Sequence, residues 1–326
     1  MNDRATAKDV VLIGLGGAGI RTVMAVRALI KNEELLAGGV SESSCRLLAI
    51  DSSYVVQDYF RDADEVDRAG VYLSQDEYLG LLRNGENPWD KVTKDAKSNI
   101  PEAERLLSRR PSVLINLAPD RNDYEAMIYV SRERMKQEIR DFLKNSEGSK
   151  EKPSAPLRLV IASSLIGDTG SLSYLELLKI LPELAEEIRF ESINVALFGP
   201  DVFEGFFHLQ TFHTAKYFSA LRSIAKFCFK VEAQQDLPNH YLISLIPGTA
   251  LHQFPRFAMF TETAKKLHKL INVQATLGNE VQDDGKNSMI EMVPLDLEKW
   301  REIEKLFVDR LAADRHFSQL VRDDFS

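Results

Sequence analysis

The chain has 326 residues, of which 44% are hydrophobic and 28% charged, and its 41 basic and 49 acidic side chains give a formal charge of −8. This apolar content is enough for a buried core and argues against a largely disordered chain. The acidic balance argues against broad, sequence-independent nucleic-acid binding, which needs a basic surface.

The N-terminal segment and the cysteines bear on the cellular location of the protein and on disulfide or metal sites. The N-terminal residues show no signal-peptide pattern, and no run of about 18 apolar residues occurs in the chain. Cys45 and Cys228 lie far apart, which argues against a disulfide framework or a cysteine-rich metal site. We therefore expect a cytoplasmic protein without a membrane span and without nucleic acid as a partner.

Short apolar runs alternate with helical patterns along most of the chain. In chain order, the sequence predicts a strand at 10–13, a helix at 19–36, strands at 47–50 and 113–117, a helix at 123–144, a strand at 157–162, a helix at 172–188, a strand at 193–198, a helix at 205–227, a strand at 241–245, a helix at 255–271, a strand at 289–293 and a helix at 297–311. Residues 51–111 are predicted to form short helices and loops, and the polar residues 146–156 a loop within the sheet. Continuous apolar strands alternating with helices predict an α/β fold with a doubly wound, mostly parallel sheet.

The first candidate binding loop follows the first predicted strand. It reads GLGGAG from Gly14 to Gly19 and fits the pattern G-x-G-x-x-G between a strand and a helix. Glycines allow a sharp turn and close approach of the backbone to a phosphate, and the start of a helix favours negative charge. We expect Gly16, Gly17, Ala18 and Gly19 to bind phosphate; the alternative is a tight turn that binds nothing.

A second glycine loop follows the strand at 157–162 and supplies further donors for phosphate oxygens. Its expected binding residues are Gly167, Asp168, Thr169, Gly170 and Ser171. The carboxylate of Asp168 would repel a polyphosphate unless a cation bridges them, so Mg²⁺ at Asp168 is one interpretation. The other is that Asp168 or Thr169 caps the following helix.

Acidic residues near two other strand ends offer contacts to a sugar. Glu204 or Asp201 could accept hydrogen bonds from ribose hydroxyls, or both could cap the helix that follows; spacing does not decide between these. Asp51 lies 32 residues after Gly19, whereas a dinucleotide-binding Rossmann unit has its ribose-binding acid about 20 residues after the glycines. No P-loop motif occurs, so the pattern differs from that of P-loop enzymes.

In this order, the segments VVLIGLGGAG, LLAIDSS, GDTGS and GPDVFEG resemble the tubulin/FtsZ superfamily, and most closely its bacterial tubulin-like branch, over residues 8–275. The resemblance implies that both glycine loops bind the phosphates of GTP or GDP and that Glu204 contacts the ribose. It places Asp51 and Ser52 near the nucleotide and His208 where FtsZ has an arginine. Within the superfamily signature G-G-G-T-G-[ST]-G, this chain departs at Ile166, Asp168 and Leu172.

The same resemblance suggests how the C-terminal part of the chain is organised. Assembling members carry a second domain and complete a neighbour's active site with an acidic loop, whereas here only some 55 residues follow the helix at 255–271. We predict a nucleotide-binding domain at 1–275 and an extension at 276–326, whose helix has Trp300, Ile303, Leu306, Phe307 and Leu311 on one face. That helix is expected to pack on the body, with binding of another protein as the alternative. Asp283-Asp284 could imitate the acidic loop, although a solvated turn is the simpler interpretation.

The expected function is therefore nucleotide binding, with GTP favoured, combined with self-association and weak or absent hydrolysis. The base is left open, because the asparagine that reads guanine in FtsZ is not evident near residue 255. One alternative is a Rossmann-type enzyme that binds NAD(P) or ATP, supported by GLGGAG alone. The other is a structural protein with a degenerate pocket, which Ile166, Asp168 and Leu172 favour. His208 and His213 are five residues apart, which argues against a zinc pair.

Overall fold

The computed structural model describes most of the chain. The described residues are 10–37, 45–52, 73–83, 85–110, 121–144, 156–203, 211–231, 238–246, 258–272, 290–315 and 317–319. The predicted strand at 113–117, nearly all of the predicted loop at 146–156, and Asp283-Asp284 lie outside them.

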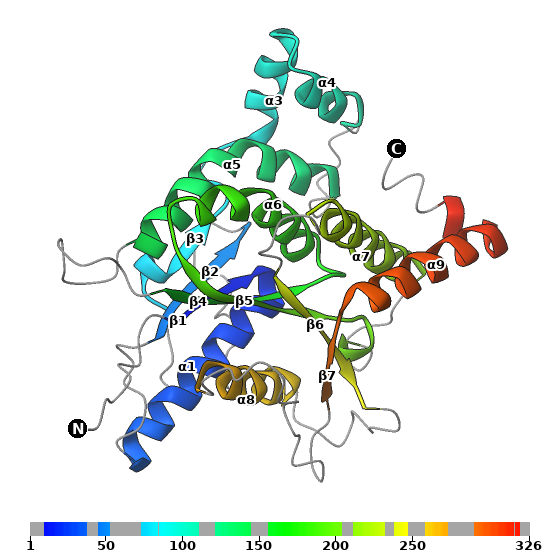
Figure 1. Cartoon of the computed structure of the whole chain (residues 1–326). Helices are drawn as coiled ribbons and strands as arrows, with labels where there is room; N and C mark the ends of the chain where they lie inside the picture. The colour runs from blue at the N-terminus through cyan, green and yellow to red at the C-terminus, as the bar shows by residue number, and fades with distance from the viewer. Residues whose placement is uncertain are drawn as a thin grey trace.

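A single sheet of seven strands forms the centre of the described structure (Figure 1). In space the strand order is β3-β2-β1-β4-β5-β6-β7; neighbouring strands are parallel except for the antiparallel pair β6 and β7. The strands are β1 (Val10–Leu15), β2 (Cys45–Asp51), β3 (Tyr78–Gly80), β4 (Leu157–Ser164), β5 (Phe190–Phe198), β6 (Asn239–Leu245) and β7 (Ile290–Pro294). The predicted α/β class with a mostly parallel, doubly wound sheet is confirmed.

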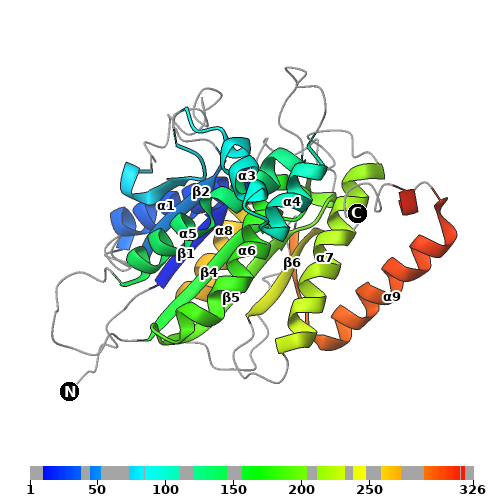
Figure 2. The same ribbon diagram turned by 90° about the horizontal axis from the view of Figure 1, so that it is seen from above.

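Helices cover both faces of this sheet. They are α1 (Gly16–Ala37), α3 (Pro88–Lys97), α4 (Pro101–Ser108), α5 (Arg121–Lys144), α6 (Asp168–Ala185), α7 (Thr211–Val231), α8 (Ala258–Asn272) and α9 (Leu297–Ala313), with the short 3-10 turns η3 (Gln75–Glu77) and η4 (Asp201–Phe203). α1 and α8 lie together on one face, and α5, α6 and α7 lie on the other (Figures 1 and 2). No helix in the described part of the chain is long and apolar enough to cross a membrane.

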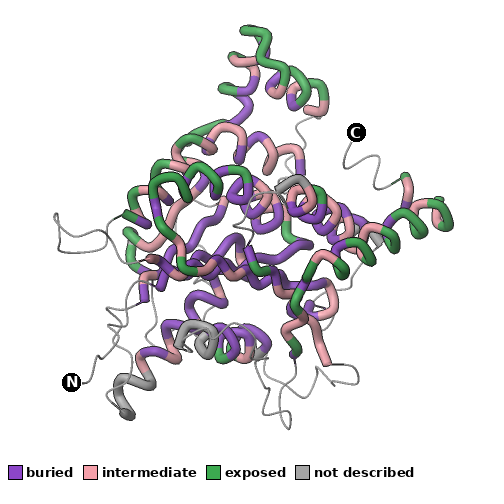
Figure 3. The backbone as a smooth tube through the Cα atoms, viewed as in Figure 1, coloured by how far each residue is buried: buried purple, intermediate pink, exposed green. Residues whose placement is uncertain are grey.

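The core explains why the central strands are continuous apolar runs. Every residue of β1 is buried, as are seven of the eight residues of β4, because helices cover both faces of these strands (Figure 3). Side chains of α1, α6 and α8 complete the same core, including Val23, Leu177 and Leu267. A smaller separate core joins α3, α4 and α5 around Trp89. Of these helices, α3 and α4 stand out from the body at the top of Figure 1.

The last elements of the described chain extend the sheet rather than stand apart from it. β7 pairs with β6, the Leu295 backbone N–H donates to the carbonyl oxygen of His240, and Trp300 of α9 is buried in the main core. α9 packs on α7, as expected. Of the apolar residues predicted to share one face of α9, Leu306 is 59% exposed, whereas Phe307 beside it is 1% exposed. The buried stripe of α9 is therefore narrower than its apolar pattern, with Trp300 and Phe307 buried and Leu306 exposed.

Candidate functional site

The strand order reverses beside β1, which lies between β2 and β4. α1 begins directly after β1, and α6 begins at Asp168, just beyond the end of β4. The two helices leave the sheet toward opposite faces, so their first turns lie next to each other at the carboxyl edge (Figure 1). In open α/β sheets this reversal point is where ligands bind.

The two glycine loops are in direct backbone contact at this edge. Gly16 has a φ of +66°, and a Cβ added to it would lie 2.8 Å from the backbone nitrogen of Gly170. A Cβ on Gly19 would overlap the carbonyl oxygen of Ala162 in β4. Neither position can accept a side chain without movement of the backbone, so glycine is required where β1, α1, β4 and α6 meet.

A buried hydroxyl lies beside this contact. A Cβ on Gly170 would come within 3.1 Å of both the carbonyl oxygen of Leu15 and Oγ of Ser163. Ser163 is 0% exposed, and its Oγ has no hydrogen-bond partner in the described structure. Buried hydroxyl groups are normally paired, so an unpaired one here indicates a place for a further acceptor or donor.

Helix geometry adds donors at the same point. The first four N–H groups of a helix have no acceptor within it, and the helix dipole makes this end positive. The first turns of α1 and α6 comprise Gly16–Gly19 and Asp168–Ser171 respectively. The predicted phosphate-binding residues of both loops are therefore brought together, although their binding to phosphate stays a prediction.

Asp51 is the last residue of β2, and its side chain contacts Thr169 of the second glycine loop. Its side chain is almost fully buried, and Oδ1 accepts hydrogen bonds from the backbone nitrogen of Ser52 at 2.5 Å and from Ser52 Oγ at 3.0 Å. Burial raises the pKa of the carboxyl to about 6, and hydrogen bonds from Ser52 and Thr169 and the charge of Arg21 act against this. Asp51 and Ser52 therefore lie beside the first turn of α6.

Tyr124, on the first turn of α5, was not predicted from the sequence. Burial and the charges of Asp168 and Asp51 raise the pKa of its hydroxyl, while hydrogen bonds with Thr169 and Ser52 lower it. The hydroxyl therefore lies among side chains from the end of β2 and from the first turn of α6. No local motif marks this tyrosine, because only the packing of α5 on α6 brings it to the site.

Asp168 is held by two basic side chains from neighbouring helices. Lys216 Nζ of α7 donates to both carboxylate oxygens, at 2.9 Å and 2.8 Å, and Arg121 Nη1 of α5 lies 3.4 Å from Oδ1. Arg121 also pairs with Glu125, 3.6 Å from its Nε. Burial and the charge of Lys216 lower the pKa of His213, one turn away on α7, while Asp168 raises it.

These contacts do not suit Asp168 as a ligand for Mg²⁺, since Lys216 occupies both of its oxygens. Among the described residues, no group of three or more His, Cys, Asp or Glu side chains is placed to hold a metal ion. Mg²⁺ bound together with a nucleotide stays a prediction. Arg121 and Lys216 together neutralise the carboxylate of Asp168.

The third predicted loop is described only in part. Asp201 Oδ2 accepts a hydrogen bond from the backbone nitrogen of Leu245 at 2.6 Å, which ties η4 to the end of β6. Glu204 and His208 lie outside the described residues, so their predicted ribose and phosphate contacts stay predictions. Phe203, at the end of the described part of this loop, and Tyr217 of α7 are buried.

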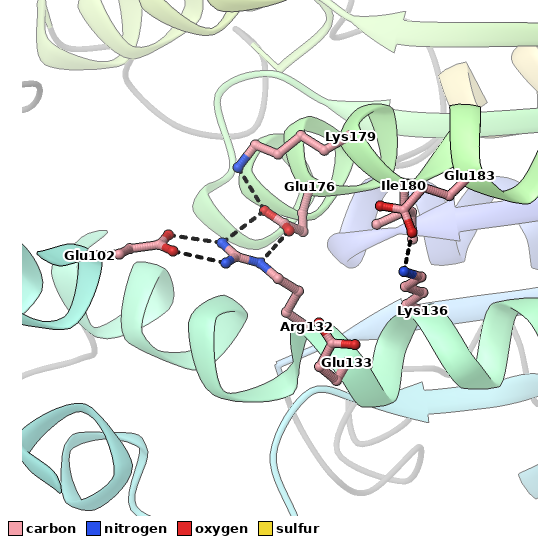
Figure 4. A pocket seen from close by; sticks show the side chains of 8 residues that line it. All are labelled: Glu102, Arg132, Glu133, Lys136, Glu176, Lys179, Ile180 and Glu183. Atoms are coloured by element: carbon pink, nitrogen blue, oxygen red, sulfur yellow. Dashed lines mark hydrogen bonds and ion pairs between the residues drawn. The ribbon is translucent and has the colours of Figure 1, made fainter. Parts of the chain in front are cut away.

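A second, strongly charged cavity of about 300 Å³ lies between α4, α5 and α6 (Figure 4). Arg132 occupies its centre and pairs with Glu102 at 2.8 Å and with the buried Glu176. Lys179 pairs with Glu176, and Lys136 with Glu183. The charges that line this cavity largely satisfy one another, and their ion pairs link α4 and α6 through α5.

Comparison with known proteins bears on the fold. No protein-family model and no curated protein matches the chain. Among solved structures, CetZ from Methanosaeta thermophila strain DSM 6194 matches with a TM-score of 0.49 and 13% identity over 83% of this chain. A GTPγS-form protofilament of TubZ from Bacillus thuringiensis serovar israelensis matches with a TM-score of 0.46 and 11% identity over 81% of this chain.

The chain is similar in fold to tubulin/FtsZ-like proteins. The chain spans 56% of the length of each of these two proteins. Assignment to the bacterial tubulin-like branch and the division of the chain at residue 275 stay predictions.

Proposed function

We propose that the chain binds a nucleotide, GTP or GDP, with its phosphates between the first turns of α1 and α6. The contact between Gly16 and Gly170 carries this proposal, because it joins two helix N-termini and two side-chain-free loops at one point. The unpaired hydroxyl of Ser163 beside Gly170 supports it as a donor that still needs an acceptor. The choice of guanine rests on the superfamily resemblance.

Different residues of the chain would have different roles in binding the nucleotide. Backbone N–H groups of both first turns would hold phosphate oxygens, while Arg121 and Lys216 neutralise Asp168 beside them. Asp51 and Tyr124 fix the position of Thr169, which places the α6 loop against the β1 loop. Self-association is proposed on the resemblance, as is slow hydrolysis.

Isothermal titration calorimetry with GTP, GDP, ATP and NAD tests the proposal. We expect guanine nucleotides to bind and NAD not to bind. Binding of NAD without GTP would reassign the site to a Rossmann-type enzyme. If none of the four nucleotides binds or raises the melting temperature, the structural protein with a degenerate pocket is selected instead.

Gly16→Ala provides a variant with a matched control. Both Gly16 and Gly85 have positive φ, +66° and +76°, so alanine strains the backbone at either position by about 1–2 kcal/mol. A Cβ at Gly85 has nothing within 4 Å, whereas one at Gly16 strikes the Gly170 backbone. We expect Gly16→Ala to abolish nucleotide binding and Gly85→Ala to retain it; equal affinities in the two variants would contradict the proposed site.

A further inference from the structure

Asp168 brings three helices together at the proposed nucleotide site. Asp168 is the first residue of α6, and the two cations that bind its carboxylate are Arg121 of α5 and Lys216 of α7. The side chains of Arg121 and Lys216 are only 8% and 12% exposed, and that of Asp168 is 16% exposed. The three charges therefore interact in a partly dry environment, where they are stronger than at an open surface.

The position of this cluster sets up a competition. Asp168 is two residues before Gly170, the residue that touches the β1 loop. An anion held at the first turn of α6 would draw on the same basic side chains that Asp168 already engages. Arg121 is also shared with Glu125, which in turn lies 3.0 Å from Arg109. Little uncompensated positive charge is left for a further phosphate.

We propose that Asp168 is a specificity-determining residue that makes this site select a nucleoside diphosphate over the corresponding triphosphate. The inference rests on the proposed function. Two phosphates can be held by the backbone groups around Gly16 and Gly170, where the helix dipoles favour them. A third phosphate adds charge beside a carboxylate that competes with it for Arg121 and Lys216.

Calorimetric titration of GDP and GTP at one fixed salt and Mg²⁺ concentration tests this inference. Asp168→Asn removes the competing charge and retains a side chain of nearly the same shape. We expect it to strengthen GTP binding at least tenfold, which is about 1.4 kcal/mol, and to change GDP binding less than threefold. Asp141→Asn serves as the control, because it removes the same charge at an exposed position of α5. It should leave the ratio of the two dissociation constants unaltered.

A second variant should change the preference for GDP over GTP in the opposite direction. Its result does not depend on whether Asp168→Asn folds. Lys216→Met removes a cation and leaves Asp168 less neutralised, so GTP binding should weaken more than GDP binding. Weaker GTP binding in Asp168→Asn, or an unchanged GDP-to-GTP ratio in either variant, would overturn the role of Asp168. Failure of the wild type and both variants to bind any nucleotide would instead overturn the proposed function.

Discussion

Replacement of Asp51 by asparagine should stabilise the nucleotide-free protein at neutral pH. Burial raises the pKa of this carboxyl to about 6, so above that pH the folded protein holds a charge that the interior disfavours. The difference from the ordinary aspartate value near 3.9 corresponds to about 3 kcal/mol, at 1.36 kcal/mol per pH unit. Asparagine keeps an acceptor for the Ser52 N–H but loses the stronger bonds of a carboxylate, so we expect a gain of about 1–3 kcal/mol.

The pH dependence of the stability difference shows whether the buried charge of Asp51 causes it. A carboxyl whose pKa is raised on folding contributes stability below about pH 4, and this contribution is lost as the pH rises through about 6. The free-energy difference between Asp51→Asn and wild type should therefore be largest at pH 7.5 and shrink toward pH 4.5. Urea unfolding followed by circular dichroism measures it at each pH, because the contributions of all other groups cancel.

Asp309→Asn serves as the control, since Asp309 is exposed on α9 and its replacement should change stability by less than about 0.5 kcal/mol. Destabilisation by Asp51→Asn at pH 7.5, or a difference that does not vary with pH, would refute the reasoning. In either case the carboxylate of Asp51 would contribute more to the fold than its burial costs.

Two further predictions concern acid stability and turnover. His240 is buried with Nε2 2.5 Å from the Tyr174 hydroxyl, and burial lowers its pKa to about 4, so the unfolded chain takes up the proton first. This group should cost about 3 kcal/mol of stability as the pH falls from 7 to 4, and urea unfolding of His240→Gln should show a shallower acid slope; an unchanged slope would contradict the buried neutral histidine. The slow hydrolysis proposed above predicts that GTP turnover per molecule is slow and independent of protein concentration. A steep rise with concentration in a phosphate-release assay would show instead that assembly completes an active site.

Much of the fold follows from local patterns that the sequence displays. The runs at Val10–Leu15 and Leu157–Ser164 are apolar without alternation, and glycine loops follow both, so a buried parallel sheet with ligand loops at its edge is predictable. β3 was not predicted, because a strand of three residues gives too short a pattern. The exposure of Leu306 could not be predicted, because helical spacing does not say how wide a stripe of α9 is covered by its neighbours.

The chemistry of the site was less accessible from the sequence. Glycine loops can be found because a phosphate imposes a local spacing on them. Arg121, Tyr124 and Lys216 carry no such signal, since they reach Asp168 and Asp51 only through the packing of α5, α6 and α7. The sequence did show that a carboxylate at position 168 needs a positive partner, and the missing information was that helices distant in sequence supply it.

Titration of ¹⁵N-glycine-labelled protein with GDP or GTP, followed by amide resonances, tests the central claim most directly. Gly16, Gly17 and Gly19 report on the β1 loop, Gly167 and Gly170 report on the α6 loop, and Gly85 in the turn before α3 provides an internal reference. Resonances of both loops should shift along one binding curve while Gly85 stays in place. Shifts confined to the first loop, or none in either loop at saturating nucleotide, would contradict a single phosphate site shared by the two helix N-termini.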